Sequence, residues 1–209
     1  MTNNYSKTPG FRSVPRTGVI YVMHEAIKHG YSPEKKEWAN LGQGAPETGA
    51  LEESPERRQS VEILINHHEY SPVVGLTDLR KKVAEFYNYF YRKGKSSQYT
   101  YENVCISGGG RAGLTRLAAS LSNINMGHFI PDYTAYEELL NIFKAFVSIP
   151  ILLSPKKHYS FSTKELTKEI TGRGLKALLI SNPCNPTGKL ISDEELNQWV
   201  SLSRKLECT

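Results

Sequence analysis

The sequence predicts an α/β fold in which a mainly parallel β-sheet is sandwiched between helices. From residue 103 onward, short apolar runs alternate with stretches of helical periodicity. Strands separated by helices pair in parallel, because the connecting helices pack on the faces of the sheet. Two polar loops, at residues 107–111 and 182–188, each follow a predicted strand. Ligands of such sheets bind beyond the carboxyl ends of the strands, so both loops are expected to face one crevice.

The first hundred residues predict helices joined by irregular segments. Residues 1–15 mix small polar side chains with proline and are expected to form an arm. Apolar residues recur at helical spacing through residues 17–29, and Gly30 is well placed to end that helix. Residues 42–46 hold two glycines and a proline, which suit an irregular loop. A second helix, residues 77–94, has one apolar face and ends at its glycine.

The alternating region predicts four strands and four helices. The strands are expected at residues 104–106, 128–130, 147–153 and 176–181, and the helices at residues 112–121, 136–146, 163–170 and 192–206. Ser192 precedes the last helix and Glu195 follows three residues later, which is the pattern of a capping box.

Composition favours a soluble globular protein, with 209 residues, 39% hydrophobic and 22% charged. No apolar run approaches the roughly 20 residues that span a bilayer, and no signal-peptide pattern opens the chain, so the cytoplasm is expected. The three cysteines lack paired spacing, which favours reduced thiols over disulfides or a metal site. The net charge of +5 is dispersed, so nucleic acid is not an expected partner.

The polar loop at residues 181–188 reads Ser-Asn-Pro-Cys-Asn-Pro-Thr-Gly. Two Asn-Pro pairs fix the backbone twice and leave two amide side chains available for a ligand. This stretch resembles the N-P-x-N-P-T-G loop of class I/II aminotransferases, which are fold type I enzymes that use pyridoxal 5'-phosphate. The resemblance implies a cis Asn185-Pro186 bond and a hydrogen bond from Asn185 to the 3'-oxygen of the cofactor. Asn182, Thr187 and Gly188 are expected to shape the turn.

The glycine loop, residues 107–113, lies between a predicted strand and a helix, where backbone N–H groups and the helix dipole favour phosphate. A tight turn without a ligand would use the same glycines. The loop also matches the G-x-G-x-x-G of dinucleotide-binding folds, with Asp132 near the place of the ribose acid. Such a fold has no use for the Asn-Pro loop. The aminotransferase resemblance implies that Gly109, Gly110 and Arg111 bind the cofactor phosphate.

Three further segments match the same family. Residues 131–136 resemble its P-x-[YW]-x-x-Y, which implies that Tyr133 stacks on the pyridine ring while Tyr136 packs. Tyr70, in a Y-x-x-x-x-G-x-x-x-L-R match, would reach the cofactor phosphate of a neighbouring subunit in a homodimer, or would be an ordinary turn tyrosine. Residues 41–46 resemble L-x-x-G-x-P, which implies that the Gly44 backbone lies near the substrate carboxylate.

The resemblance also implies a domain plan. Residues 1–45 would form the arm and a segment of the small domain, and residues 46–209 the N-terminal part of the large domain that binds pyridoxal 5'-phosphate. No catalytic residue is assigned, because the Schiff-base lysine and the aspartate for the pyridine nitrogen follow later in the family. The chain is therefore expected to be truncated and inactive alone. Lys189, beside the Asn-Pro loop, is expected to be a solvated lysine.

The function implied by the resemblance is amino-group transfer between an amino acid and a 2-oxo acid. A lyase or synthase on the same fold is an alternative, because fold and cofactor do not fix the reaction. A non-catalytic fragment or paralogue that only dimerises or binds is a third possibility. The preference for a substrate side chain is not encoded in any recognised motif of this chain.

Overall fold

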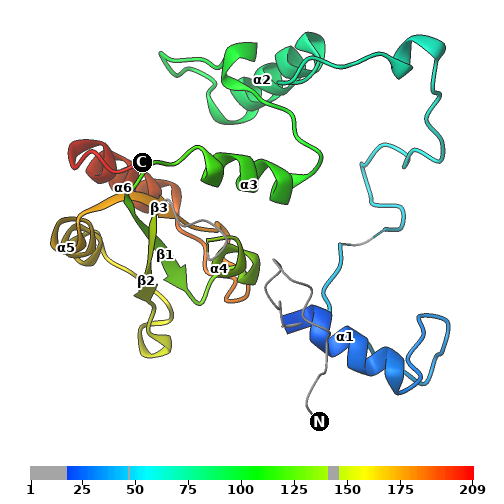
Figure 1. Ribbon diagram of the computed structural model, residues 1–209, viewed down its shortest axis with the longest axis horizontal. Helices are drawn as coiled ribbons and strands as arrows, with labels where there is room; N and C mark the ends of the chain where they lie inside the picture. The colour runs from blue at the N-terminus through cyan, green and yellow to red at the C-terminus, as the bar shows by residue number, and fades with distance from the viewer. Residues whose placement is uncertain (1–17, 47, 141–145) are drawn as a thin grey trace, which may run out of the picture. The chain divides into compact units, whose positions relative to one another are not determined.

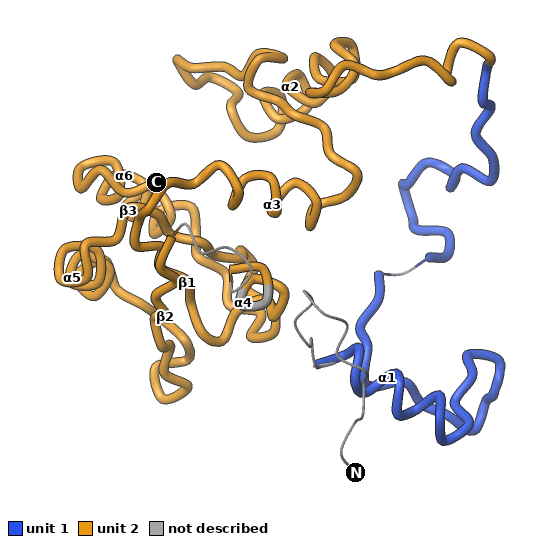
Figure 2. Tube along the Cα trace, viewed as in Figure 1, with its two compact units in different colours: residues 1–64 blue, residues 65–209 orange. Residues whose placement is uncertain are grey.

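The computed structural model describes residues 18–46, 48–140 and 146–209 and divides into two compact units (Figure 2). The N-terminal unit, residues 1–64, contains α1 (Gly18–Lys28), which confirms the predicted first helix. Gly30 follows that helix with φ at 93°, a conformation that glycine adopts without strain. The expected arm at residues 1–15 lies outside the described residues. The domain boundary at residues 45 and 46 stays a prediction.

The C-terminal unit, residues 65–209, carries the remaining elements (Figure 1). In chain order they are η1 (Ile65–His68), α2 (Thr77–Tyr91), η2 (Tyr101–Asn103), α3 (Gly110–Ala119), β1 (Asn125–Ile130), α4 (Thr134–Leu140), β2 (Val147–Leu152), η3 (Pro155–Lys157), α5 (Thr163–Arg173), β3 (Leu175–Leu179) and α6 (Asp193–Lys205). Every predicted helix and three of the four predicted strands are confirmed to within a few residues. Residues 141–145 of the predicted fourth helix lie outside the described residues.

The predicted strand at residues 104–106 is wrong, because its backbone groups pair elsewhere than in the sheet. The Ile106 N–H donates to the Val74 carbonyl oxygen at 3.0 Å, and the Val104 carbonyl accepts from Arg80 Nε at 2.8 Å. Gly75 permits this approach, since a Cβ there would lie 2.6 Å from Ile106 Cγ1. The glycine loop therefore follows an extended segment that packs against the start of α2.

The sheet is parallel, with strand order β2-β1-β3, and it is covered by helices on both faces. An irregularity between Asn125 and Met126 turns Leu175 and Ala177 of β3 to opposite faces. One core joins the sheet to α5 and α6 through Phe129, Ile151, Leu166, Ile170, Leu175, Trp199 and Cys208. The other joins it to α3 and α4 through Ala118, Met126, Leu140, Phe146 and Ala177. This layering confirms the predicted fold class.

Capping and edge contacts fix how the last elements begin and end. Ser162 and Glu165 form a reciprocal capping box at α5. At α6, where the sequence predicts one, only half of the box forms, with the Ser192 hydroxyl accepting from the Glu195 N–H at 3.4 Å. Thr209 pairs in parallel fashion with the outer edge of β3, donating its N–H to the Lys176 carbonyl at 2.9 Å and accepting from the Leu178 N–H at 2.8 Å. Within the described ranges, no helix combines the length and apolarity needed to cross a bilayer.

Candidate functional site

The Asn-Pro loop, residues 181–191, is closed by hydrogen bonds between its two sides. The Asn182 amide donates to the Ile191 carbonyl at 3.2 Å and accepts from the Ile191 N–H at 2.9 Å. The Cys184 N–H donates to the Lys189 carbonyl at 2.8 Å. The Lys189 N–H donates in turn to the Thr187 hydroxyl at 3.2 Å. These contacts confirm that Asn182 organises the turn, and the Asn185-Pro186 bond is cis as expected.

Asn185 differs from Asn182, although both precede a proline in the same loop. Its side chain is exposed and makes no hydrogen bond to any described residue. Its backbone N–H donates to the Ser181 hydroxyl oxygen at 3.2 Å, which holds the residue while the amide group stays available. The amide carries two donors and one acceptor oxygen, so it can recognise a polar atom of a ligand.

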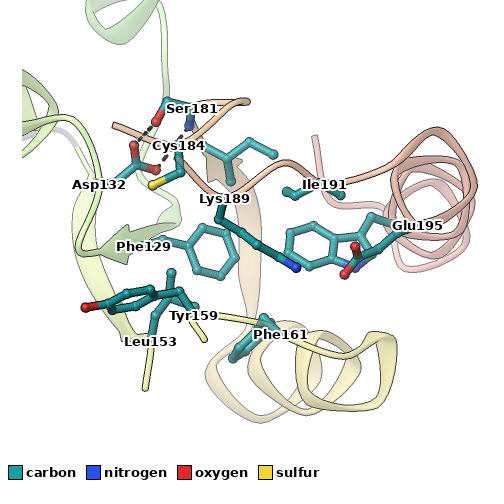
Figure 3. Close-up of a pocket in the computed structure, with 12 residues that line it drawn as sticks. Phe129, Asp132, Leu153, Tyr159, Phe161, Ser181, Cys184, Lys189, Ile191 and Glu195 are labelled. Atoms are coloured by element: carbon teal, nitrogen blue, oxygen red, sulfur yellow. Dashed lines mark hydrogen bonds between the residues drawn. The ribbon is translucent and has the colours of Figure 1, made fainter. Parts of the chain in front are cut away.

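Asp132 and Ser181 hold the Asn-Pro loop to the end of β1, a contact that the sequence analysis missed. Asp132 Oδ2 accepts from the Ser181 N–H at 3.1 Å, and Oδ1 accepts from the Ser181 hydroxyl and, at 2.6 Å, from the Tyr133 N–H (Figure 3). The Cys184 thiol adds a weak bond to the Pro131 carbonyl at 3.5 Å. The sequence could have indicated this contact, because Asp132 and Ser181 each follow a predicted strand and the carboxyl ends of neighbouring parallel strands lie at one edge of a sheet.

The glycine loop, residues 107–113, has free space around its first three glycines and leads into the first turn of α3. Gly109 precedes the helix with φ at 101° and ψ at 157°, a conformation that is essentially restricted to glycine. The Ser107 hydroxyl donates to the Gly109 carbonyl at 3.0 Å. A Cβ on Gly113 would lie 2.9 Å from Ser107 Oγ, so packing accounts for the glycine that completes the dinucleotide pattern. The first-turn N–H groups of α3 have no acceptor within the helix and favour an anion.

Arg111 and Tyr133 join the glycine loop to the end of β1. Arg111 Nη2 donates to the Tyr133 hydroxyl at 3.0 Å, and the guanidinium carbon lies 5.7 Å from the centre of the ring. The Tyr133 ring meets Tyr136 edge to face at 5.5 Å. Burial raises the pKa of the Tyr136 phenol, and the charge of Asp132 acts in the same direction. Tyr136 thus supports the ring of Tyr133 by packing, as predicted.

Continuous hydrogen bonding therefore links three of the predicted site residues, Arg111, Tyr133 and Asn185, through Asp132 and Ser181. Gly109 and Gly110 adjoin them at the start of α3.

Two predicted site residues make no hydrogen bond to this group in the described part of the chain. Tyr70 is fully exposed in the C-terminal unit, so the structure does not bring it to Arg111 or Tyr133. Gly44 is exposed in the N-terminal unit, and a Cβ there would meet no atom within 4 Å.

A small cavity of about 30 Å³ lies behind the Asn-Pro loop, on the face of the sheet that α6 covers (Figure 3). Phe129, Trp199 and the half-buried Lys189 line it, and Lys189 extends toward Glu195. The prediction of a solvated Lys189 therefore holds only in part, because apolar neighbours cover its stem. The cavity has room for one or two water molecules. Arg111, Tyr133 and Asn185 do not line it, but Asp132, Ser181 and Cys184 do, so it adjoins the candidate site from behind.

Comparison with known proteins relates this arrangement to one family. The family model described as aminotransferase class I and II matches residues 36–208. The aspartate aminotransferase of Sulfolobus acidocaldarius is 27% identical over 143 residues, which cover 65% of this chain and 33% of that protein. The inactive alanine aminotransferase of Saccharomyces cerevisiae is 26% identical over 148 residues, which cover 67% of this chain and 28% of that protein.

Solved structures agree with the sequence relatives. The aspartate aminotransferase from Thermus thermophilus with maleate superposes with a TM-score of 0.58 at 25% identity, covering 67% of this chain and 36% of that one. The chain spans about a third of the length of the curated relatives that it matches.

Proposed function

Since the chain belongs to the class I and II aminotransferase family, we propose that it provides the cofactor-binding part of a pyridoxal 5'-phosphate-dependent site for amino-group transfer between an amino acid and a 2-oxo acid. One observation carries the proposal. The Asn185 amide has no hydrogen-bond partner among the described residues, although the loop around it is tightly paired. An exposed amide on a backbone that is itself hydrogen-bonded is accessible to a ligand atom.

The residues at the start of α3 fit a phosphate group. An added Cβ at Gly108, Gly109 or Gly110 would meet no atom within 4 Å, so the backbone there is open to a bulky anion. The helix N-terminus favours negative charge, and Arg111 adds a cation in the first turn. In the proposed site these residues bind the phosphate of pyridoxal 5'-phosphate and fix the position of the molecule.

Tyr133 and Asn185 fit the ring of the same molecule. The Tyr133 ring is held by Arg111 through its hydroxyl and by the perpendicular ring of Tyr136, so it offers a fixed aromatic surface for stacking. Asn185 would donate a hydrogen bond to the 3'-oxygen and stabilise negative charge there. When bound, pyridoxal 5'-phosphate supplies an electron sink for carbanion chemistry. We propose Gly44 as a backbone contact to the substrate carboxylate.

Affinity measurements on matched variants test the proposal. We expect Arg111→Ala to weaken binding of both inorganic phosphate and pyridoxal 5'-phosphate by about tenfold or more, because a charge-assisted hydrogen bond contributes about 1.5 to 3 kcal/mol. Arg116→Ala removes the same charge from the exposed far end of α3 and should change either affinity less than about twofold. We expect Asn185→Ala to weaken only the pyridoxal compound. Unchanged binding by Arg111→Ala, or no binding by the wild type, would contradict the assignment.

We propose that the site is completed in a homodimer by Tyr70. Its side chain is fully exposed, which leaves its hydroxyl accessible to a second copy. Tyr70→Phe should therefore weaken phosphate binding at chain concentrations where sedimentation detects a dimer, and not where it detects a monomer. Equal phosphate affinity of the wild type and Tyr70→Phe at every concentration would contradict this role.

The cytoplasm is the proposed location, and all three cysteines are free thiols.

A non-catalytic binding role is the second candidate. It is favoured by one relative alone, the S. cerevisiae protein named inactive alanine aminotransferase. A mixture of amino acid, 2-oxo acid and pyridoxal 5'-phosphate separates the two roles. We expect little amino transfer by these 209 residues alone. Robust transfer would exclude the binding role, and elimination products instead would favour a lyase or synthase.

A further inference from the structure

We propose that Asp132 is a positioning residue of the proposed site. It holds Ser181 and, through the Ser181 hydroxyl, keeps Asn185 oriented toward the ligand that Tyr133 stacks on. This inference rests on the proposed function and extends it to a residue that is assigned no contact with the phosphate or the pyridine ring of the ligand.

The carboxylate of Asp132 is engaged mainly over a long sequence distance. Two of its three recorded hydrogen bonds come from the Ser181 N–H and hydroxyl, 49 residues away. The third comes from the adjacent Tyr133 N–H. An aspartate that capped α4 would accept from the second or third N–H of that helix, and no such bond is recorded for Asp132. Its contacts therefore serve the junction between β1 and the Asn-Pro loop.

Strand pairing explains why this junction forms. In the parallel register of β1 and β3, His128 lies beside Leu179, so the chain leaves both strands at the same edge of the sheet. Asp132 follows β1 and Ser181 follows β3. The Cys184 thiol contacts the Pro131 carbonyl at 3.5 Å and adds a second link between the same two segments.

The Ser181 hydroxyl transmits the position of Asp132 to Asn185. It donates its hydrogen to the carboxylate, so its lone pairs are presented to the Asn185 N–H, which donates to it at 3.2 Å. In Asp132→Asn, an amide group replaces one acceptor oxygen. Both carboxylate oxygens accept from Ser181, so the amide nitrogen replaces the acceptor either of its hydroxyl or of its N–H, and in both cases the hydroxyl is held less firmly for the Asn185 N–H. The side chain of Asn185 then samples more orientations, while Arg111, which has no direct hydrogen bond to Asp132, keeps its place in the first turn of α3.

The first test compares two ligands of one protein. In Asp132→Asn we expect the affinity for pyridoxal 5'-phosphate to fall about tenfold, because the bond from Asn185 is lost, and the affinity for inorganic phosphate to stay within about twofold. Asp193→Asn makes the same change at an exposed carboxylate and should alter neither affinity. Adding Asp132→Asn to Asn185→Ala should cause no further loss, because the first residue acts through the second. Additive losses, or equal loss for both ligands, would overturn the proposal.

The second test needs no cofactor. Thiol labelling followed at each cysteine should modify half-buried Cys184 several times faster in Asp132→Asn, because the link to Pro131 loosens. Exposed Cys105 serves as the internal standard, and buried Cys208 reports whether the fold is intact. An unchanged Cys184 rate would overturn the proposal. If Asp132→Asn exposes Cys208, Ser181→Ala replaces it and decides the question by the same rates.

The two tests separate the failure of this inference from the failure of the proposed function. A wild type that does not bind pyridoxal 5'-phosphate contradicts the proposed function, whatever the labelling shows. A wild type that binds it, with unchanged affinity and labelling in Asp132→Asn, contradicts only the positioning role.

Discussion

The Asn-Pro loop and the glycine loop are built in opposite ways. In the first, side-chain and backbone groups pair across the loop at Asn182, Cys184 and Lys189, and Asp132 ties the loop to β1. In the second, the bonds are local, from the Ser107 hydroxyl and from two glycine N–H groups to carbonyls of the same loop, and an added Cβ on any of its first three glycines would meet open space.

This difference matches what each loop is proposed to recognise. A hydrogen bond to one ring oxygen depends on direction, so its donor needs a fixed backbone. A phosphate accepts hydrogen bonds on several oxygens and responds to the summed field of a helix N-terminus. Open backbone with a suitable dipole is therefore enough for the phosphate, while the ring requires a closed loop.

The largest expected effect comes from closing the open loop. Gly109→Ala should destabilise the chain by about 2 kcal/mol, because φ at 101° with ψ at 157° is strained for any residue with a Cβ. Urea unfolding measures the loss. Gly108→Ala is the matched control, since its φ is not positive and its surroundings are open. Equal stability of the two variants would mean that the glycine loop tolerates side chains generally.

A smaller effect should come from opening the closed loop. Asn182→Ala removes both hydrogen bonds to Ile191 and should lower the free energy of unfolding by about 1 to 2 kcal/mol. Asn185→Ala should leave stability within about 0.5 kcal/mol, because its amide has no partner to lose. Thermal unfolding of both variants measures the contrast. Equal losses would show that Asn185 is structural and would weaken its assignment to a ligand.

The smallest effect should be a loss of folding stability in acid that depends on Glu165, at the start of α5. The Lys157 ammonium, at 2.6 Å, and the Ser162 N–H and hydroxyl lower the pKa of Glu165 from 4.5 to about 2. A lowered pKa contributes stability above pH 4.5 that is lost as pH falls toward about 2. Because the Glu165 side chain is 37% exposed, solvent screening limits the contribution to about 0.5 kcal/mol.

Trp199 fluorescence can follow this acid transition. The ring stacks on Phe129 at 5.7 Å, and Trp38→Phe removes the signal of the other tryptophan. Glu165→Gln should abolish the dependence between pH 4.5 and 2. This acid dependence is compared with the acid dependence of phosphate binding at the glycine loop, because residues 107–113 contain no carboxyl group. A transition that persists in Glu165→Gln would place the acid-sensitive group elsewhere.

Local patterns predicted the elements of this fold better than its contacts. Apolar periodicity identified α1 and α2, a capping-box pattern marked the start of α6, and short apolar runs identified the strands of the sheet. Residues 104–106 have the same apolar character, yet Val74 and Arg80 take their backbone groups, and no local pattern reveals which partner wins. The bond between Asp132 and Ser181 depends on β3 lying beside β1, which is a matter of strand order.

The single residue that pairs with the outer edge of β3 has a consequence for assembly. Thr209 occupies one position along a row of backbone donors and acceptors, and within the described residues β3 has no other neighbour on that side. Exposed strand edges recruit further strands. The row of amides beside Thr209 is therefore the place at which a further strand, from whatever source, can join this sheet.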